Sequence, residues 1–119
     1  MLAKKPIPYE MQIYWPMQLV VGAGGMISTI SDCLKWNNAL YGGAALPKLL
    51  TELMLTPHMK DGPQYYGYGI AICKLGEPGL YYEHQGRITG FTTRLVYIPT
   101  LNLSIISLAN IRGLSLIHI

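Results

Sequence analysis

One histidine stands where a short aromatic strand is expected to meet a glycine-rich bend. The stretch from Tyr81 to Phe91 reads Tyr-Tyr-Glu-His-Gln-Gly-Arg-Ile-Thr-Gly-Phe. Aromatic residues favour extended backbone, and Gly86 permits a positive φ or the close approach of a ligand. We therefore expect a strand that ends at His84, a bend at Gly86, and a turn at Gly90 into the next strand.

This arrangement could bind an anion or stabilise a developing oxyanion. The imidazole of His84 could contact an anion, and the amides after Gly86 would lack strand partners at such a bend. A lone His-x-Gly at a strand end is more often an ordinary turn. The stretch therefore indicates a reactive site only if the rest of the chain supports it.

Length and composition indicate one globular domain. The chain has 119 residues, of which 50% are hydrophobic and 13% are charged, a composition that excludes a disordered chain. Charge-free stretches such as Leu19 to Ile27 are glycine-rich and shorter than the roughly 20 residues of a spanning helix, so we expect no transmembrane segment. The nine basic residues are scattered apart from one pair, which argues against nucleic acid as a partner.

Cysteine spacing gives no metal or cofactor signal. Cys33 and Cys73 form no Cys-x-x-Cys motif and have no neighbouring histidine, so we expect two buried thiols, no metal and no cofactor. A disulfide between them stays open as an alternative. The redox compartment is therefore undetermined.

The first half of the chain predicts two helices. Ser28 or Thr29 would cap a helix over residues 29–41, with Asp32 in capping-box spacing and two glycines at its end, so the hydroxyls here indicate caps rather than a nucleophile. A second helix is expected over residues 47–55, followed by a loop over residues 57–63. Its predicted core residues are Leu49, Leu50, Leu53 and Met54.

The second half predicts consecutive strands. The period of two favours a strand over residues 65–73 and a reversal at 76–79 into a strand over 80–84. Further strands are expected over 91–98 and 103–109, with a turn between them. Two helices followed by four strands predict an α+β fold, an antiparallel sheet backed by helices.

Both ends of the chain look truncated or foreign to the fold. Residues 1–18 mix prolines with large apolar side chains and predict an extended segment without a secretion signal. Residues 111–119 form a tail, in which 114–119 resemble the translation of a transposon-end sequencing adapter, so we assign His118 no function. The folded part is expected over residues 19–110.

Four motifs in this order resemble the C-terminal part of the serine β-lactamase-like family, which includes class C β-lactamases, D-alanyl-D-alanine carboxypeptidases and esterases. They are Gly24 to Asp32, Tyr66-Gly67-Tyr68-Gly69, His84 to Phe91, and Ile105 to Asn110. The resemblance implies a partial penicillin-binding-protein-like fold, a small-molecule or peptide substrate, and a periplasmic or extracellular location for the parent protein.

The resemblance also implies roles for four residues at the strand edge. His84 would take the place of the lysine in the family's Lys-Thr-Gly element and hold the substrate carboxylate or tune proton transfer. Gln85 and Gly86 would form the substrate-binding wall, with Gln85 standing where the family often has a hydroxyl residue. The backbone amide of Arg87 would be one of two oxyanion-hole donors.

The family's nucleophile element Ser-x-x-Lys and its Tyr-x-Asn element do not occur in this sequence. Both would precede this segment in the family. We therefore expect a serine hydrolase parent that cleaves amide or ester bonds through an acyl-serine, and an inactive fragment. Two alternatives are a non-catalytic, ligand-sensing member of the family and a β-rich binding module whose contact surface is Tyr65, Tyr66, Tyr68, Tyr81 and Tyr82.

Overall fold

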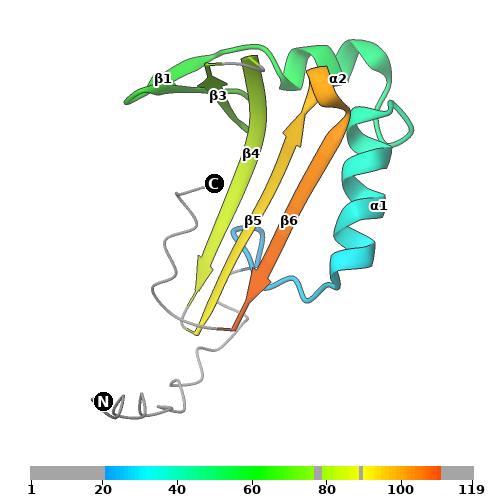
Figure 1. The fold of residues 1–119 in the computed structure, drawn as a ribbon, viewed down its shortest axis with the longest axis vertical. Coiled ribbons are helices and arrows are strands. Elements are labelled where there is room, and N and C mark those ends of the chain that lie inside the picture. The colour runs from blue at the N-terminus through cyan, green and yellow to red at the C-terminus, as the bar shows by residue number, and fades with distance from the viewer. Residues whose placement is uncertain (1–20, 77–78, 89, 111–119) are drawn as a thin grey trace, which may run out of the picture.

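The computed structural model of the chain describes residues 21–76, 79–88 and 90–110. Six antiparallel strands form one sheet in sequence order, with one helix alongside it and a shorter helix at its end (Figure 1), which confirms the α+β prediction. The elements are α1 (Ile30–Tyr41), α2 (Lys48–Met54), β1 (Met59–Asp61), β2 (Gln64–Tyr66), β3 (Ala71–Leu75), β4 (Gly79–Ile88), β5 (Phe91–Ile98), the 3₁₀ turn η2 (Pro99–Leu101) and β6 (Leu103–Ala109).

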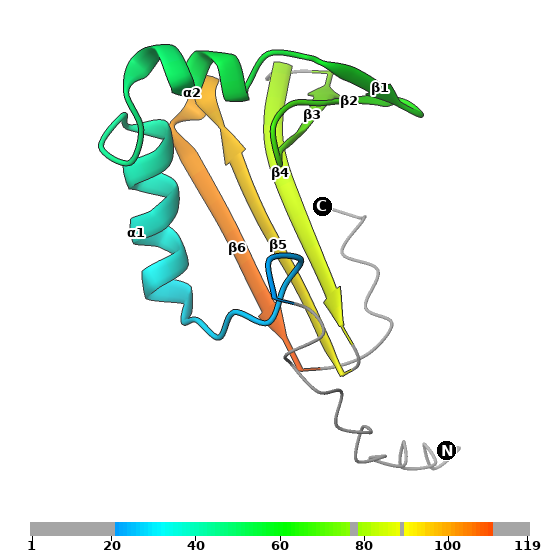
Figure 2. The ribbon, with the colours of Figure 1, turned by 180° about the vertical axis from the view of Figure 1, so that it is seen from behind.

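The sheet has a long half and a short half. β4, β5 and β6 run side by side over most of their length, whereas β1, β2 and β3 gather at one end of the sheet (Figures 1 and 2). β3 pairs with β4 only as far as Ala71 opposite Glu83. β4 then continues from His84 to Ile88 with β5 as its neighbour on one side.

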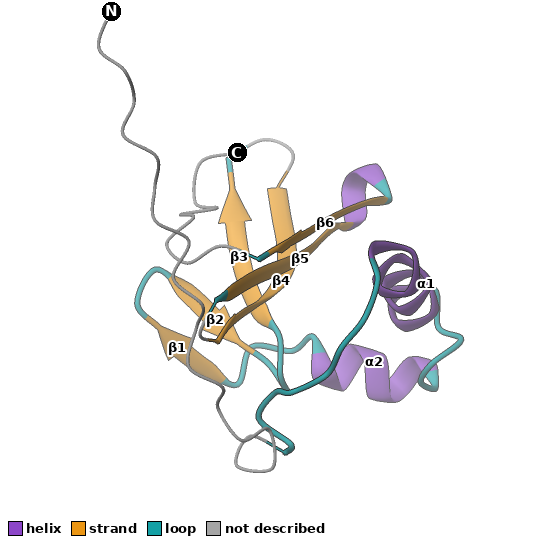
Figure 3. Cartoon of the chain, turned by 90° about the horizontal axis from the view of Figure 1, so that it is seen from below, coloured by secondary structure: helices purple, strands orange, loops and turns teal. Residues whose placement is uncertain are grey.

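Helix α1 lies alongside β5 and β6 (Figure 3). The ring of Tyr41 stacks on Tyr97 at 4.1 Å between centroids and on Tyr82 at 5.9 Å, so one helical residue spans two strands. Asn37, which is only 3% exposed, donates from Nδ2 to the carbonyl oxygen of Val96 at 3.5 Å. Stacked rings and a buried amide therefore fix α1 on the sheet.

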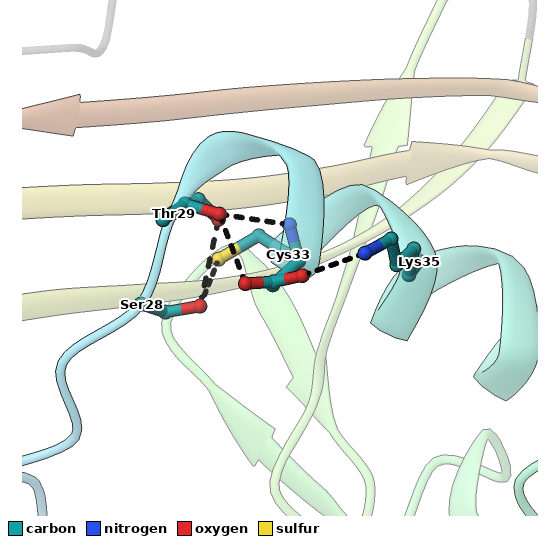
Figure 4. A network of polar contacts seen from close by, with 5 residues as sticks. Ser28, Thr29, Cys33 and Lys35 are labelled. Atoms are coloured by element: carbon teal, nitrogen blue, oxygen red, sulfur yellow. Dashed lines mark hydrogen bonds and ion pairs between the residues drawn. The ribbon is translucent and has the colours of Figure 1, made fainter.

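The first turn of α1 has the predicted cap (Figure 4). The amide of Asp32 donates to Thr29 Oγ1 at 3.2 Å, and that hydroxyl donates to Asp32 Oδ2 at 3.1 Å. Lys35 lies 2.9 Å from Asp32 Oδ1. Hydrogen bonding from Lys35, and then from Thr29, lowers the pKa of the Asp32 carboxyl. Thr29 is the N-cap, and the helix ends at Tyr41 with Gly42 as its C-cap, as expected.

The prediction that α2 contributes core leucines is wrong. Leu49 is 74% exposed, and Leu50 and Leu53 are each 47% exposed; Met54 is half-buried. Helical periodicity reports which side chains share a face, but not whether another element covers that face. The buried apolar residues of the described chain lie instead in α1 and the sheet, and they are Leu40, Ala71, Ile72, Cys73, Val96 and Ile98.

The predicted strand over residues 65–73 is two strands with a break between them. At the break, Tyr68 N–H donates to the Met54 carbonyl oxygen at 3.0 Å, so the backbone meets the end of α2 instead of continuing the ladder. Gly67 is needed there, because a Cβ would lie far inside contact distance of that oxygen. The predicted loop over 57–63 is also wrong in part, since it contains β1.

The bend predicted at Gly86 is absent. β4 runs through Gly86, which pairs with Thr93 on β5, and ends at Ile88. The glycine serves a different purpose, because the Oγ1 of Thr93 occupies the space that a Cβ would need. Gly90, with φ of 84°, is positioned for the turn between β4 and β5.

The predictions for residues 1–18 and 111–119 lie outside the described residues and stay predictions. Within the part of the chain that the structure describes, no helix is both long and apolar enough to cross a membrane. Cys33 and Cys73 carry free thiols.

Candidate functional site

Among the described residues, the second half of β4 has a neighbouring strand on one side only, and we call it the open edge. It pairs with β5 from His84 opposite Leu95 to Ile88 opposite Phe91, whereas β3 reaches only to Glu83. Successive residues of an antiparallel strand direct their N–H and C=O groups alternately to its two sides. Alternate peptide groups between His84 and Ile88 therefore face a side on which the described residues provide no neighbouring strand.

An ion pair orients β4 against β5 immediately before this edge. Arg94 Nε donates to Glu83 Oε2 at 2.7 Å, and a terminal guanidinium nitrogen lies 2.5 Å from the same oxygen. The side chains of Arg94 and Glu83 are 18% and 11% exposed. Both contacts are charge-assisted hydrogen bonds to one carboxylate oxygen, and such bonds are stronger than bonds between neutral groups. The pair therefore fixes the strand next to His84.

A thiol and a phenol complete this cluster. Cys73 Sγ lies 3.2 Å from Gln64 Oε1 and 3.9 Å from Glu83 Oε1, and its one proton can be donated to either oxygen. Burial chiefly raises the pKa of the Cys73 thiol, and the Glu83 charge adds to the rise. Burial, followed by hydrogen bonding to Cys73, raises the pKa of Tyr81 to about 12. Both groups are neutral at pH 7, so neither is an activated nucleophile.

A shallow hollow of about 150 Å³ opens between β2 and β4. We call it the polar hollow, because most of its wall is polar. The ring of Tyr66 lies edge-on to His84, with centroids 6.5 Å apart. The lining residues are Asp61, Gln64, Tyr66, Ala71, Glu83, His84 and Gln85.

The four residues singled out in the sequence divide between this hollow and the open edge. His84 and Gln85 are exposed and line the polar hollow. Gly86 is half-buried and Arg87 is exposed, and both follow along the open edge. Arg87 lies opposite Thr92 in the β4–β5 pairing, so it stands in a regular strand instead of the bare bend that the sequence predicted.

Sequence reasoning missed the other wall of the hollow. Asp61 and Gln64 are brought there by the β1–β2 hairpin, in which they pair across Gly62 and Pro63. Gly62 has a φ of 58°, which suits a tight turn. The Asp-Gly dipeptide was the available signal for this hairpin, but the loop prediction passed over it.

The other side chains that could act as a nucleophile or a base make hydrogen bonds within the fold. Ser28 Oγ donates to the Thr29 carbonyl at 3.4 Å and accepts from the Cys33 thiol at 3.5 Å, within the first turn of α1 (Figure 4). The exposed His58 has Nε2 2.9 Å from the Leu53 carbonyl oxygen. Among the residues that the structure describes, no three His, Cys, Asp or Glu side chains gather as a metal site would require.

A solved structure shares this fold. The penicillin binding protein from Bacillus halodurans is similar with a TM-score of 0.65 and 29% identity, covering 71% of this chain and 26% of that one. The chain therefore spans about a quarter of that protein's length. No curated protein matches the chain. The sheet and its helices thus have the fold of part of a penicillin-binding protein.

The chain belongs to the beta-lactamase family, whose model matches residues 2–115. The resemblance inferred from the four ordered motifs is confirmed at the level of this family, and the protein is a member of a family of serine hydrolases.

Proposed function

We propose that the protein carrying this chain is a serine hydrolase that cleaves an amide or ester bond through an acyl-serine intermediate. Its substrate would be a β-lactam, a D-Ala-D-Ala peptide or an ester. The observation that carries the proposal is the open edge of β4, where the exposed His84 stands beside a polar hollow in a chain of this family. Peptide groups along such an edge are available to a substrate lying beside it.

The proposed reaction needs a serine as the nucleophile and groups on this edge of β4 to bind the substrate and the oxyanion. The serine oxygen attacks the carbonyl carbon, the carbonyl oxygen becomes an oxyanion, and collapse of the intermediate expels the amine or alcohol. Water then releases the acyl group from the serine. The Arg87 amide would donate to the oxyanion, and His84 would orient the substrate carboxylate or transfer protons. Loss of one oxyanion donor typically costs about 3–4 kcal/mol of barrier.

We place the nucleophile outside these 119 residues. No serine of the chain is followed by lysine at the third position, and no tyrosine has asparagine two residues on. Of the chain's own serines, Ser28 takes part in the polar network around the first turn of α1. The chain by itself is therefore proposed to be inactive, providing one wall of a site whose serine lies elsewhere in the protein.

The test compares two histidine variants of the whole protein. His84→Gln should lower kcat/KM for a chromogenic cephalosporin or p-nitrophenyl acetate by at least about tenfold, as expected for a group that assists proton transfer or positions substrate. His58→Gln is the matched control, because His58 is exposed but does not line the hollow. Equal activities of the two variants would contradict the role of His84.

The alternative is a ligand-sensing member without turnover. It is favoured by Gln85, which stands where the family often has a hydroxyl residue. A protein of this kind would bind a labelled penicillin reversibly and release it unchanged. Stoichiometric binding without product, followed by mass spectrometry of the released ligand, would establish it in place of the hydrolase.

A further inference from the structure

The polar hollow begins where the open edge of β4 begins. β3 stops pairing at Glu83, and the next two residues, His84 and Gln85, belong both to the edge and to the hollow. The opposite wall is the β1–β2 hairpin with Asp61 and Gln64. A substrate lying along the edge would therefore extend past His84 directly into the hollow.

The size of the hollow limits what it can hold. Its volume of about 150 Å³ is well below the roughly 300–1,000 Å³ of pockets that enclose a complete small ligand. The space therefore suits one terminal group of a larger molecule.

Asp61 supplies negative charge to the hollow, on the wall opposite His84. The carboxylate of Glu83 is paired with Arg94, so its charge is compensated. Asp61 Oδ2 instead accepts from the Gln64 amide at 3.4 Å, and none of the ion pairs formed by the described residues includes Asp61. The hollow thus presents one carboxylate without a cationic partner, near the aromatic ring of Tyr66.

We propose that the polar hollow is a substrate subsite for a primary ammonium group, a specificity that rests on the proposed hydrolase function. An ammonium has three donors, which match the Asp61 carboxylate and the Gln85 amide oxygen, and its charge is favoured near the Tyr66 ring. The subsite makes and breaks no bonds. It selects an acyl donor that carries a cationic group at the end of its acyl chain.

Binding is tested with butylammonium and its neutral counterpart butan-1-ol by ligand-observed NMR titration of the intact protein. Asp61→Asn removes the charge with little change in shape, and it should weaken butylammonium binding by about tenfold, the factor that loss of a charge-assisted contact typically gives. Asp32→Asn is the control, because this exposed carboxylate belongs to the first turn of α1. Equal binding of the amine and the alcohol, or an Asp61→Asn variant with unchanged affinity, overturns the proposal.

Measuring the hydrolysis of two esters tests the ammonium subsite independently of the hydrolase function. We expect the ratio of kcat/KM for p-nitrophenyl aminohexanoate over p-nitrophenyl heptanoate to fall about tenfold in Asp61→Asn and to stay constant in Asp32→Asn. If both esters are cleaved but the ratio does not change, the subsite is refuted and the hydrolase stands. If neither ester is cleaved while butylammonium binding still depends on Asp61, the hydrolase fails and the ammonium site stands.

Discussion

Replacing Gly67 with alanine tests how α2 is joined to the sheet. A Cβ at this position would lie far inside contact distance of the Met54 carbonyl oxygen, 3.2 Å from the Met54 carbonyl carbon and 3.3 Å from the Thr56 carbonyl oxygen. All three neighbours are backbone atoms, so no side chain can rotate away. The end of α2 must therefore move off the strand connection, and the hydrogen bond from Tyr68 to Met54 must stretch or break.

The cost follows from three contributions. Losing one backbone hydrogen bond costs about 1 kcal/mol, and overpacking typically costs about 1–3 kcal/mol. Alanine also restricts the unfolded chain, which offsets about 0.4–1 kcal/mol. We therefore expect Gly67→Ala to lower the free energy of unfolding by about 1–3 kcal/mol.

Urea denaturation followed by intrinsic fluorescence measures this change in the purified protein. Gly76→Ala is the matched control, because a Cβ there meets no atom within 4 Å and its backbone lies outside the left-handed region. The control should be neutral, or more stable by up to about 1 kcal/mol. If Gly67→Ala is as stable as Gly76→Ala, the close approach of α2 to the sheet is wrong.

Three further predictions concern the N-cap of α1, the stacked ring of Tyr41 and the close approach of Gly86 to Thr93. Thr29→Ala should lower stability by about 1 kcal/mol in the same assay, because the Asp32 amide loses its cap, and no loss would contradict that bond. Burial, followed by its two tyrosine neighbours, raises the pKa of Tyr41 from 10.0 to about 12. The unfolded state then releases this proton first, so stability should fall as pH rises from 10 to 12. Tyr41→Phe should make that fall less steep, with Tyr81 responsible for part of what remains, and an unchanged slope would refute the assignment. Gly86→Ala should cost about 1 kcal/mol, because the Thr93 side chain must move away from the new methyl group, and combining it with Thr93→Ala should recover most of that loss.

Local chemistry made α1 and the long strands predictable. Thr29 and Asp32 specify a helix start within four residues, and the structure has that cap. The β-rich stretches after Phe91 form β5 and β6 with bounds that match the predictions. In each case the signal lies within the element itself.

The predictions that were wrong concern residues whose environment is set by parts of the chain distant in sequence. Gly86 looked like a bend because glycine permits one, but its real constraint is Thr93 on the next strand. Gly67 is required by the end of α2, which lies more than ten residues earlier in the chain. The leucines of α2 share a face that no described element buries. Sequence periodicity contains no information about these partners.

The candidate site was predictable only on one side. His84 and Gln85 were identified from the family resemblance, and the structure places both beside the polar hollow. Asp61 and Gln64 come from a hairpin that was predicted as a loop. Their approach to β4 depends on sheet order, which local sequence patterns do not determine.

Covalent labelling with a fluorescent penicillin, followed by peptide mass spectrometry, tests the central claim most directly. The account predicts an acyl adduct on one serine of the whole protein, located outside these 119 residues in a Ser-x-x-Lys element, with slower labelling in His84→Gln. It also predicts that the chain alone is not labelled. An adduct on a serine of this chain, such as Ser28 or Ser104, or turnover by the chain alone, would contradict it.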